Sequence, residues 1–220
     1  MRAASLAMVS LLFGVGISAV PADEHGTHLE PYEGPFVSGG ADDYNGKVRE
    51  TLLGDLPDRD FLVVSLPSFQ PEWAVVVAEP DGATALVEFR EAKPQIWGNE
   101  DPAKQATRSA SVHISRETAR VLREVWTEML LATRHKREPV LGFDGVSWHF
   151  ATWTRGIGAR SGQIWSPPEK SPAGRLIALA ESLRELATGA SANRVAEEEQ
   201  MRSAAAALLA ELRAAQQDPK

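Results

Sequence analysis

The chain has 220 residues, enough for one domain with extensions or for two small domains. Its hydrophobic fraction of 43% and charged fraction of 24% are those of a globular protein, which excludes wholesale disorder and a multi-span membrane protein. Cysteine is absent, so disulfides, thiolate metal sites and cysteine nucleophiles are excluded. The formal net charge of −7 gives no electrostatic basis for binding nucleic acid, and we expect no such partner.

The first 22 residues have the order of a secretory signal peptide. Arg2 precedes an uncharged, mostly apolar run from Ala3 to Val20, and Val20-Pro21-Ala22 fits the small-residue cleavage pattern. An uncleaved membrane anchor is the alternative, because about 20 apolar residues can span a bilayer. The sequence predicts a signal peptide over residues 1–22, a periplasmic or secreted location, and no membrane span after cleavage.

Cleavage after Ala22 would leave a chain that begins Asp23-Glu24-His25. The free amine, two backbone amides and the imidazole of His25 could then surround Cu(II) or Ni(II) in a square of nitrogens, the geometry that these metals prefer. The pattern resembles the amino-terminal copper- and nickel-binding motif of several secreted proteins. We expect no other cofactor.

Residues 23–50 lack periodicity and are rich in proline, glycine and aspartate, which predicts a loop-rich segment with a short helix near its end. Two short apolar runs, Phe61–Leu66 and Trp73–Ala78, are typical of strands buried on both faces. Asp81-Gly82 then predicts a two-residue hairpin turn into a strand over 83–90. A turn of that length puts Val76 opposite Val87.

The polar residues 92–110 predict a long connection. Ser115 is typical of a helix N-cap, and apolar residues then recur at helical spacing until basic residues near His135 predict the end of the helix. A second Asp-Gly pair, Asp144-Gly145, predicts a hairpin between strands at 140–143 and 146–154.

Alternation along that second long strand places Trp148 and Phe150 on one face, which we expect to be buried. A glycine-rich loop, Arg155–Gly162, precedes a short strand over 163–166. Ser171-Pro172 predicts the start of a helix that ends at Gly189.

A final helix over 191–215 is rich in alanine and charge, with a thin apolar face. It could lie on the domain, project into solvent, or form an oligomer by pairing with another chain. The sequence therefore predicts an α+β protein in which an antiparallel sheet built from two Asp-Gly hairpins packs on two amphipathic helices, followed by a C-terminal helix. The expected divisions are a signal peptide (1–22), a loop-rich segment (23–50), one α+β domain (51–189) and the C-terminal helix (190–220).

His149 is the candidate for catalysis. It shares a strand face with Ser147 and Trp153, and a histidine in a pocket there could act as a general base. The chain lacks a G-x-S-x-G nucleophile elbow, an H-E-x-x-H zinc motif and a P-loop. Trp153, Arg155 and Arg160, on or beside the glycine-rich loop, are the candidates for ligand binding.

Because no catalytic constellation emerges, the sequence favours a non-catalytic binding protein of the bacterial envelope, with a protein or small ligand as its partner. The alternatives are a small periplasmic hydrolase that uses His149, and copper or nickel binding at the processed N-terminus. A pocket that holds His149 beside a carboxylate would favour the enzyme. An exposed apolar patch over a closed core would favour the binding protein.

Overall fold

The structure is a computed structural model. It describes residues 25–32, 44–54, 60–78, 83–99, 101, 104–135, 144–154, 156, 158–189 and 193–217. The expected signal peptide and the residues Asp23, Glu24, Asp81, Gly82 and Arg155 lie outside these ranges.

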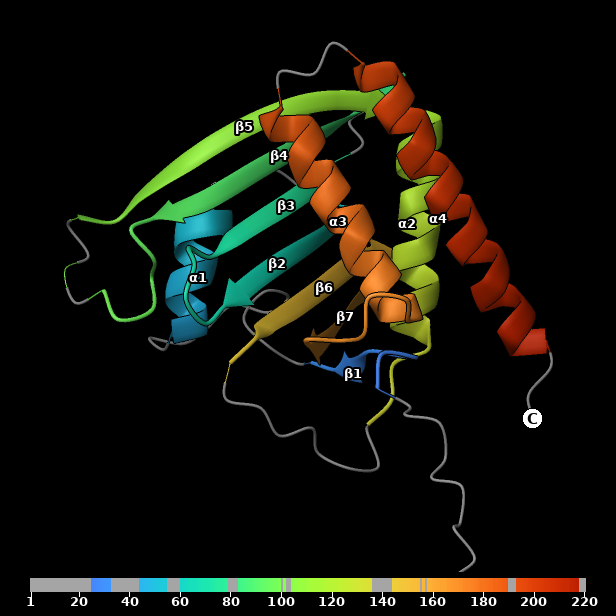
Figure 1. The fold of residues 1–220 in the computed structure, drawn as a ribbon, viewed down its shortest axis with the longest axis horizontal. Helices are drawn as coiled ribbons and strands as arrows, with labels where there is room; N and C mark the ends of the chain where they lie inside the picture. The colour runs from blue at the N-terminus through green and yellow to red at the C-terminus, as the bar shows by residue number, and fades with distance from the viewer. Residues whose placement is uncertain are drawn as a thin grey trace, which may run out of the picture.

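One seven-stranded antiparallel sheet forms the centre of the protein, in the order β1-β7-β6-β2-β3-β4-β5 (Figure 1). The strands are β1 (Glu30–Pro31), β2 (Phe61–Pro67), β3 (Trp73–Ala78), β4 (Thr84–Lys93), β5 (Ala106–Ser115), β6 (Val146–Thr154) and β7 (Gly158–Trp165).

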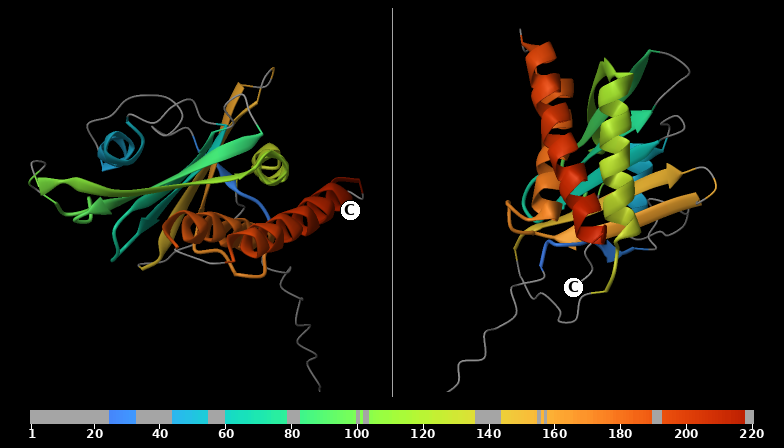
Figure 2. Two further views of the ribbon diagram at one scale, coloured as in Figure 1. Left: turned by 90° about the horizontal axis from the view of Figure 1, so that it is seen from above. Right: turned by 90° about the vertical axis from the view of Figure 1, so that its right-hand side faces the viewer.

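Four helices in the described part of the chain cover the sheet unevenly. They are α1 (Tyr44–Leu53), α2 (Arg116–Leu131), α3 (Pro172–Thr188) and α4 (Arg194–Gln217). Figure 2 shows α1 alone on one face, and α3 and α4 on the other with α2 beside them. This arrangement confirms the α+β class. None of the helices that the structure describes is both long and apolar enough to cross a bilayer.

The sheet separates two hydrophobic clusters. Phe61 and Val63 of β2 join the larger one, toward α2, α3 and α4, whereas Leu62 and Val64 join the smaller one, toward α1. Successive side chains of a strand point to opposite faces, so a strand buried on both sides reads as a continuous apolar run. The expectation of two-sided burial for β2 and β3 is confirmed.

The register of the β3–β4 pair differs from the expected one by a single residue. Val77 lies opposite Val87, and Val76 lies opposite Glu88. A two-residue turn at Asp81-Gly82 would instead pair Val76 with Val87. The observed register puts Val77 and Val87 together in the larger cluster, which burial on that face favours over the turn signal.

The neighbours of β6 also differ from expectation. β6 pairs with β2 on one side and β7 on the other, so it offers no edge to a strand over 140–143, whose residues lie outside the described ranges. β7 begins at Gly158, so Arg160 lies in a strand rather than in a loop. Trp148 and Phe150 are buried, as expected.

The strand β5 occupies residues expected to form a connection. It is mostly small and polar, and only Val112 and Ile114 are buried along it. A strand at the edge of a sheet needs no continuous apolar pattern, which is why hydrophobicity alone misses it.

Helix capping follows the sequence. The Ser115 hydroxyl accepts the backbone N–H of Thr118 at 3.2 Å and starts α2, and the Ser171 hydroxyl does the same for Gly174 at the start of α3. α2 ends at Leu131, four residues before the expected end at His135.

The C-terminal helix α4 packs against α2 and α3 rather than projecting away from them (Figure 1). Its residues Met201, Ala205, Leu208, Leu209 and Leu212 are buried in the larger cluster. Val195, near the start of the same helix, is exposed. The apolar stripe is therefore used within the chain.

Candidate functional site

A pocket of about 560 Å³ opens on the α1 side of the sheet. Its lining comes from the segment after β1, from α1, from the end of β2, from the connection between β4 and β5, and from β6 and β7. The lining residues are Tyr32, Tyr44, Asn45, Leu66, Pro67, Ser68, Phe69, Trp97, Asp144, Ser147, His149 and Gln163. Pockets of this size with a few convergent polar groups are the usual form of a small-molecule site.

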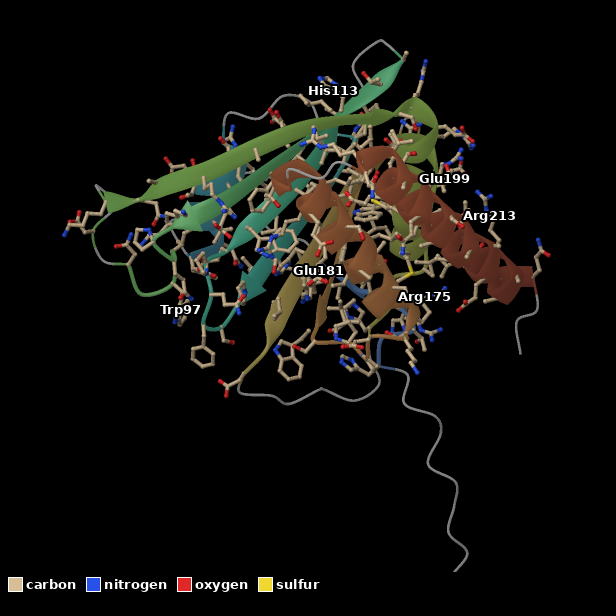
Figure 3. The ribbon with its side chains drawn as sticks, turned by 45° about the horizontal axis from the view of Figure 1, so that its top comes forward. Trp97, His113, Arg175, Glu181, Glu199 and Arg213 are labelled. Carbon is tan, nitrogen blue, oxygen red and sulfur yellow. The ribbon has the colours of Figure 1, made fainter. Side chains whose placement is uncertain are left out.

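Aromatic side chains form much of this lining. Tyr44 and Trp97 meet edge to face, with ring centroids 5.1 Å apart and planes at 88°. Trp97 is 64% exposed and Phe69 is 77% exposed, so both rings are available to a ligand. Figure 3 shows Trp97 beyond the end of β4, far from the Arg175, Glu199 and Arg213 of the helical layer.

Glu72, which is fully buried, holds the aromatic pair in place. Its carboxylate accepts the Tyr44 hydroxyl at 2.8 Å and the backbone N–H groups of Ile96 and Trp97 at 2.7 and 2.9 Å. Burial, followed by the hydrogen bond and the charge of Glu72, raises the pKa of the Tyr44 hydroxyl above its usual range. One carboxylate therefore joins α1 to the turn that carries Trp97.

A second part of the lining is built around Tyr32 and His149. Their ring centroids are 4.5 Å apart with planes at 60°. The Tyr32 hydroxyl accepts a hydrogen bond from Nδ2 of Asn45 at 3.1 Å, and its backbone carbonyl accepts the Ser161 hydroxyl. Gln163 lies opposite His149 in the β6–β7 register, which brings its amide to the same wall.

The rim near Asp144 is fixed to the end of β2. The backbone N–H and the hydroxyl of Ser68 both donate to the carbonyl of Gly145, each at 3.0 Å. The hydroxyl in turn accepts the Gly145 N–H at 3.2 Å. These bonds keep the residue before Gly145, Asp144, at the mouth of the pocket.

His149 is 5% exposed, and burial lowers its pKa to about 4. A carboxylate held against the ring would raise the pKa, but burial is the effect that dominates here. The imidazole is therefore neutral at pH 7. A general base works best when its pKa is near the operating pH, so a neutral donor and acceptor of hydrogen bonds is the role that this environment suits.

The sequence candidates are only partly brought together. Ser147 and His149 line the pocket, but Trp153 is not among the lining residues, because four residues of strand separate it from His149 by about 13 Å. Arg160 is exposed on β7 opposite Thr152, also outside the lining. Arg155 lies outside the described residues.

The candidate metal residues fall largely outside the described part. Asp23 and Glu24 are not described, and Nε2 of His25 lies 3.2 Å from the carbonyl of Ser166. The Nδ1 atom of His25 is buried. Within the described ranges, no group of three or more His, Asp and Glu residues is arranged to hold a metal ion.

Sequence reasoning missed Tyr32, Tyr44, Trp97 and Glu72, because they come from segments with no periodic pattern. Among these four residues, only Trp97 could have been singled out from the sequence, because it is a tryptophan in a mostly polar stretch. Because a tryptophan buries a large apolar area, most of the six tryptophans are predicted to lie in the core. Trp73, Trp126 and Trp148 are buried, Trp165 is half-buried, and Trp97 and Trp153 are exposed.

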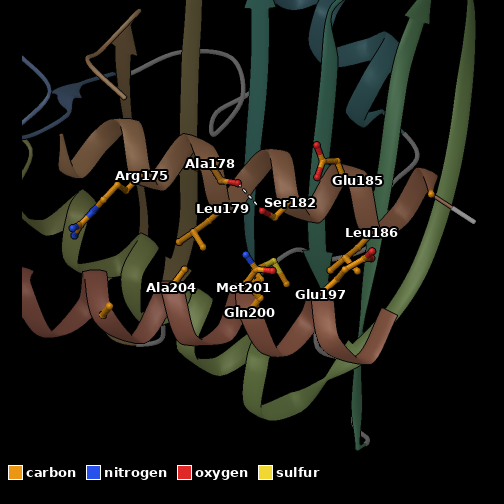
Figure 4. A pocket seen from close by; sticks show the side chains of 12 residues that line it. Arg175, Ala178, Leu179, Ser182, Glu185, Leu186, Glu197, Gln200, Met201 and Ala204 are labelled. Carbon is orange, nitrogen blue, oxygen red and sulfur yellow. Dashed lines mark hydrogen bonds between the residues drawn. The ribbon is translucent and has the colours of Figure 1, made fainter. Parts of the chain in front are cut away.

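A second cavity, of about 600 Å³, is a groove between α3 and α4 (Figure 4). Leu179, Leu186 and Met201 form its apolar floor. Arg175 at one end forms an ion pair with Glu211 at 2.8 Å, and the Ser182 hydroxyl donates to the carbonyl of Ala178 at 2.9 Å. Arg175 and Ser182 are thus already bonded within the protein. Among the described residues that line the groove none is aromatic, so the pocket beside His149 is the stronger candidate for ligand recognition.

Comparisons with protein families, with curated protein sequences and with solved structures found no match to this chain.

Proposed function

We propose that this protein is an exported binding protein and that the pocket beside His149 takes a small organic cation. The aromatic lining carries the proposal. Rings with a negative quadrupole on their faces attract cations that have apolar substituents, and aromatic cages are the recurrent solution for quaternary ammonium groups. Tyr32, Tyr44, Phe69 and Trp97 supply four such rings around one pocket.

The charge of the lining supports a cation over an anion. Among the lining residues that the structure describes, Asp144 is the only acidic residue, and none is lysine or arginine. His149 adds no positive charge at pH 7, since its pKa is about 4. An anionic ligand would meet no compensating charge there, whereas a cation would meet a carboxylate and four aromatic rings.

The same observation disfavours a hydrolase that uses His149. A base with a pKa of about 4 removes a proton only weakly at neutral pH, although the imidazole can still accept or donate a hydrogen bond. His149, Asn45, Ser147 and Gln163 would then recognise a polar group at the other end of the ligand, such as a hydroxyl.

Calorimetric titration with choline chloride tests the proposal, with 3,3-dimethylbutan-1-ol as the matched probe, because it has the same shape without the charge. We expect choline to bind about five- to thirtyfold more tightly, since a cation–π contact contributes roughly 1–2 kcal/mol. Equal affinity for the two probes, or no binding of choline, would contradict the proposal.

Variants locate the binding. Trp97→Ala removes an exposed ring of the pocket, and Asp144→Asn removes the carboxylate, so both should weaken choline binding. Trp153→Ala is the control, because it also removes an exposed tryptophan but not one that lines the pocket. Loss of affinity in Trp153→Ala alone would put the site elsewhere.

Export rests on the order of residues 1–22: a basic start, an apolar run and a small-residue cleavage pattern. N-terminal sequencing of the protein purified from its host should begin at Asp23. A mature cytoplasmic protein that retains Met1 would contradict export and leave the choline result unaffected.

A further inference from the structure

The strand β5 forms an open and regular edge of the sheet. It is last in the strand order and, among the residues that the structure describes, pairs only with β4, through ten consecutive residue pairs without a bulge (Figures 1 and 2). None of its ten residues is proline or lysine. Natural proteins usually protect such an edge with a bulge, a proline, charged side chains, a very short strand or a covering helix or loop. Of these, β5 has one charged side chain, Arg108, which forms an ion pair with Glu91 of β4, and a contact from Glu198 of α4 at its end.

The other edge of the sheet has that protection. It ends in β1, which is two residues long and contains Pro31. A proline at an edge removes a donor that another strand would need. The two edges of the sheet thus differ, and β5 is the edge that can still pair with another strand.

Two hydrogen bonds show which residues of β5 face outward. The N–H of Arg116, which follows the strand, donates to the carbonyl of Ala83 on the β4 side. The N–H of Ser115 donates instead to the carboxylate of Glu198 on α4. Because the direction alternates along an antiparallel strand, Thr107, Ser109, Ser111 and His113 present their N–H and C=O groups to the open edge.

We propose that this edge pairs with β5 of a second copy of the chain, antiparallel and about a two-fold axis at Ala110. In that register Thr107 lies opposite His113 of the second copy, and Ser109 lies opposite Ser111. Every outward-facing residue then exchanges two main-chain hydrogen bonds, and a two-fold axis uses the same surface on both copies.

The side chains fit this register. The small side chain of Ala110 meets its own copy at the axis, where strands approach closely. Arg108 lies opposite Val112 of the second copy, so the two arginines do not face one another, and each keeps its ion pair with Glu91 at 3.1 Å. A register centred on Arg108 would instead oppose two like charges, which destabilises a cross-strand pair.

α4 limits the pairing at one end. Glu198 occupies the outward N–H of Ser115 at 2.9 Å, so the free edge ends at His113, which Figure 3 labels at this margin. Stable complexes typically bury about 1,200–2,000 Å² of surface, and the pairing of two single strands buries less than that. We therefore expect a dimer that dissociates on dilution. This inference is independent of the proposed ligand.

Sedimentation velocity of the full chain over a range of concentrations measures the dimer. Ser111→Pro should shift it to monomer, because the N–H that proline removes points away from β4 and the internal ladder keeps its bonds. Circular dichroism and a thermal melt check that this variant remains folded.

Cysteine cross-linking tests the register, since the chain has no cysteine of its own. In Ala110→Cys the two Cα atoms should lie about 4.5–5.5 Å apart across the axis, within the range for a disulfide, and mild oxidation should give a covalent dimer. Thr107→Cys is the control, because its two copies would be about 20 Å apart along the strands.

A wild-type chain that stays monomeric at the highest soluble concentration would overturn the proposal. So would equal cross-linking of the two cysteine variants. A dimer that persists in folded Ser111→Pro would assign the interface to another surface, such as α4, and would also overturn it.

Discussion

The carboxylate of Glu72 and the hydroxyl of Tyr44 are joined by a hydrogen bond of 2.8 Å between a loop and a helix that are distant in sequence. Because the same carboxylate binds the backbone of Ile96 and Trp97, the geometry of the pocket depends on it. An isolated buried carboxylate would be costly, and three donors offset that cost.

Glu72→Gln should therefore destabilise the protein by about 2 kcal/mol, because the amide offers one acceptor oxygen where three donors converge. Chemical denaturation measures the change, and Glu50→Gln, on the exposed side of α1, should leave stability unaltered. Adding Tyr44→Phe completes a double-mutant cycle. Additive effects of the two changes would contradict a direct link.

His149 should make stability depend on pH. The folded state keeps a pKa of about 4, against the ordinary value of 6.5 that we take for the unfolded chain, so the unfolded chain binds a proton first as pH falls. Stability from this residue is fully present above about pH 6.5 and declines toward pH 4, by roughly 3 kcal/mol in total. His149→Gln should flatten that part of the pH profile measured by urea denaturation.

The matched control for that experiment is His113→Gln, which removes an exposed imidazole from β5. The slope between pH 4 and 6.5 should remain as in the wild type. If His149→Gln kept the full slope, burial of His149 would not be its source.

Trp148 and Trp153 form a natural pair for testing the core, since they lie on opposite faces of β6. Trp148 is 5% exposed and meets Trp73 edge to face at 5.3 Å, whereas Trp153 is 55% exposed. Trp148→Ala should cost about 3–5 kcal/mol and Trp153→Ala less than about 1 kcal/mol. Thermal melts of both variants measure the two losses of stability. Similar losses would mean that the faces of β6 are wrongly assigned.

Glu198 joins α4 to the first turn of α2. Burial alone would raise its pKa, but hydrogen bonds from Ser115 and Thr118 outweigh burial and lower the pKa. Its contribution is thus present above the ordinary glutamate pKa and lost as pH falls through the folded pKa. Glu198→Gln should cost about 1 kcal/mol or less at pH 7, because solvent screens a partly exposed group, and the difference should disappear in acid.

The control for Glu198 is Glu199→Gln on the exposed side of the same helix, because its ion pair with Arg202 lies at the surface and such pairs contribute little to stability. A loss of stability that stayed constant down to pH 2 would mean that the charge of Glu198 is not what matters.

Leu208 tests whether α4 belongs to the core. It is 1% exposed within the larger cluster, so Leu208→Ala should cost about 2–5 kcal/mol, as in other cores. Val195→Ala, at a site 84% exposed on the same helix, should change little. A small effect at Leu208 would mean that α4 is not part of the core.

Sequence patterns predicted the structure best where it depends on burial or on hydrogen bonds between near neighbours in the chain. The apolar runs at Phe61–Leu66 and Trp73–Ala78 predicted strands covered on both faces, and Ser115 and Ser171 marked helix starts, because a cap is a bond between near neighbours. The face of Trp148 and Phe150 followed from alternation alone.

Where a turn motif and the burial of side chains favoured different registers, the turn motif was the less reliable. Asp81-Gly82 predicted a register one residue away from the one that pairs Val77 with Val87. Burying both valines in one cluster outweighs the preference of a single turn. The edge strand β5 has no hydrophobic pattern, because most of its side chains are exposed and only Val112 and Ile114 are buried.

The sequence by itself determined the α+β class, the buried strands and the helix starts, and it identified His149 as a candidate functional residue. Only the tertiary structure decided what surrounds His149. Tyr32, Tyr44, Trp97 and Glu72 lie in segments of the chain without periodicity, and contacts between distant segments bring them together. Such contacts depend on how strands and loops stack in space, and no local propensity encodes that arrangement.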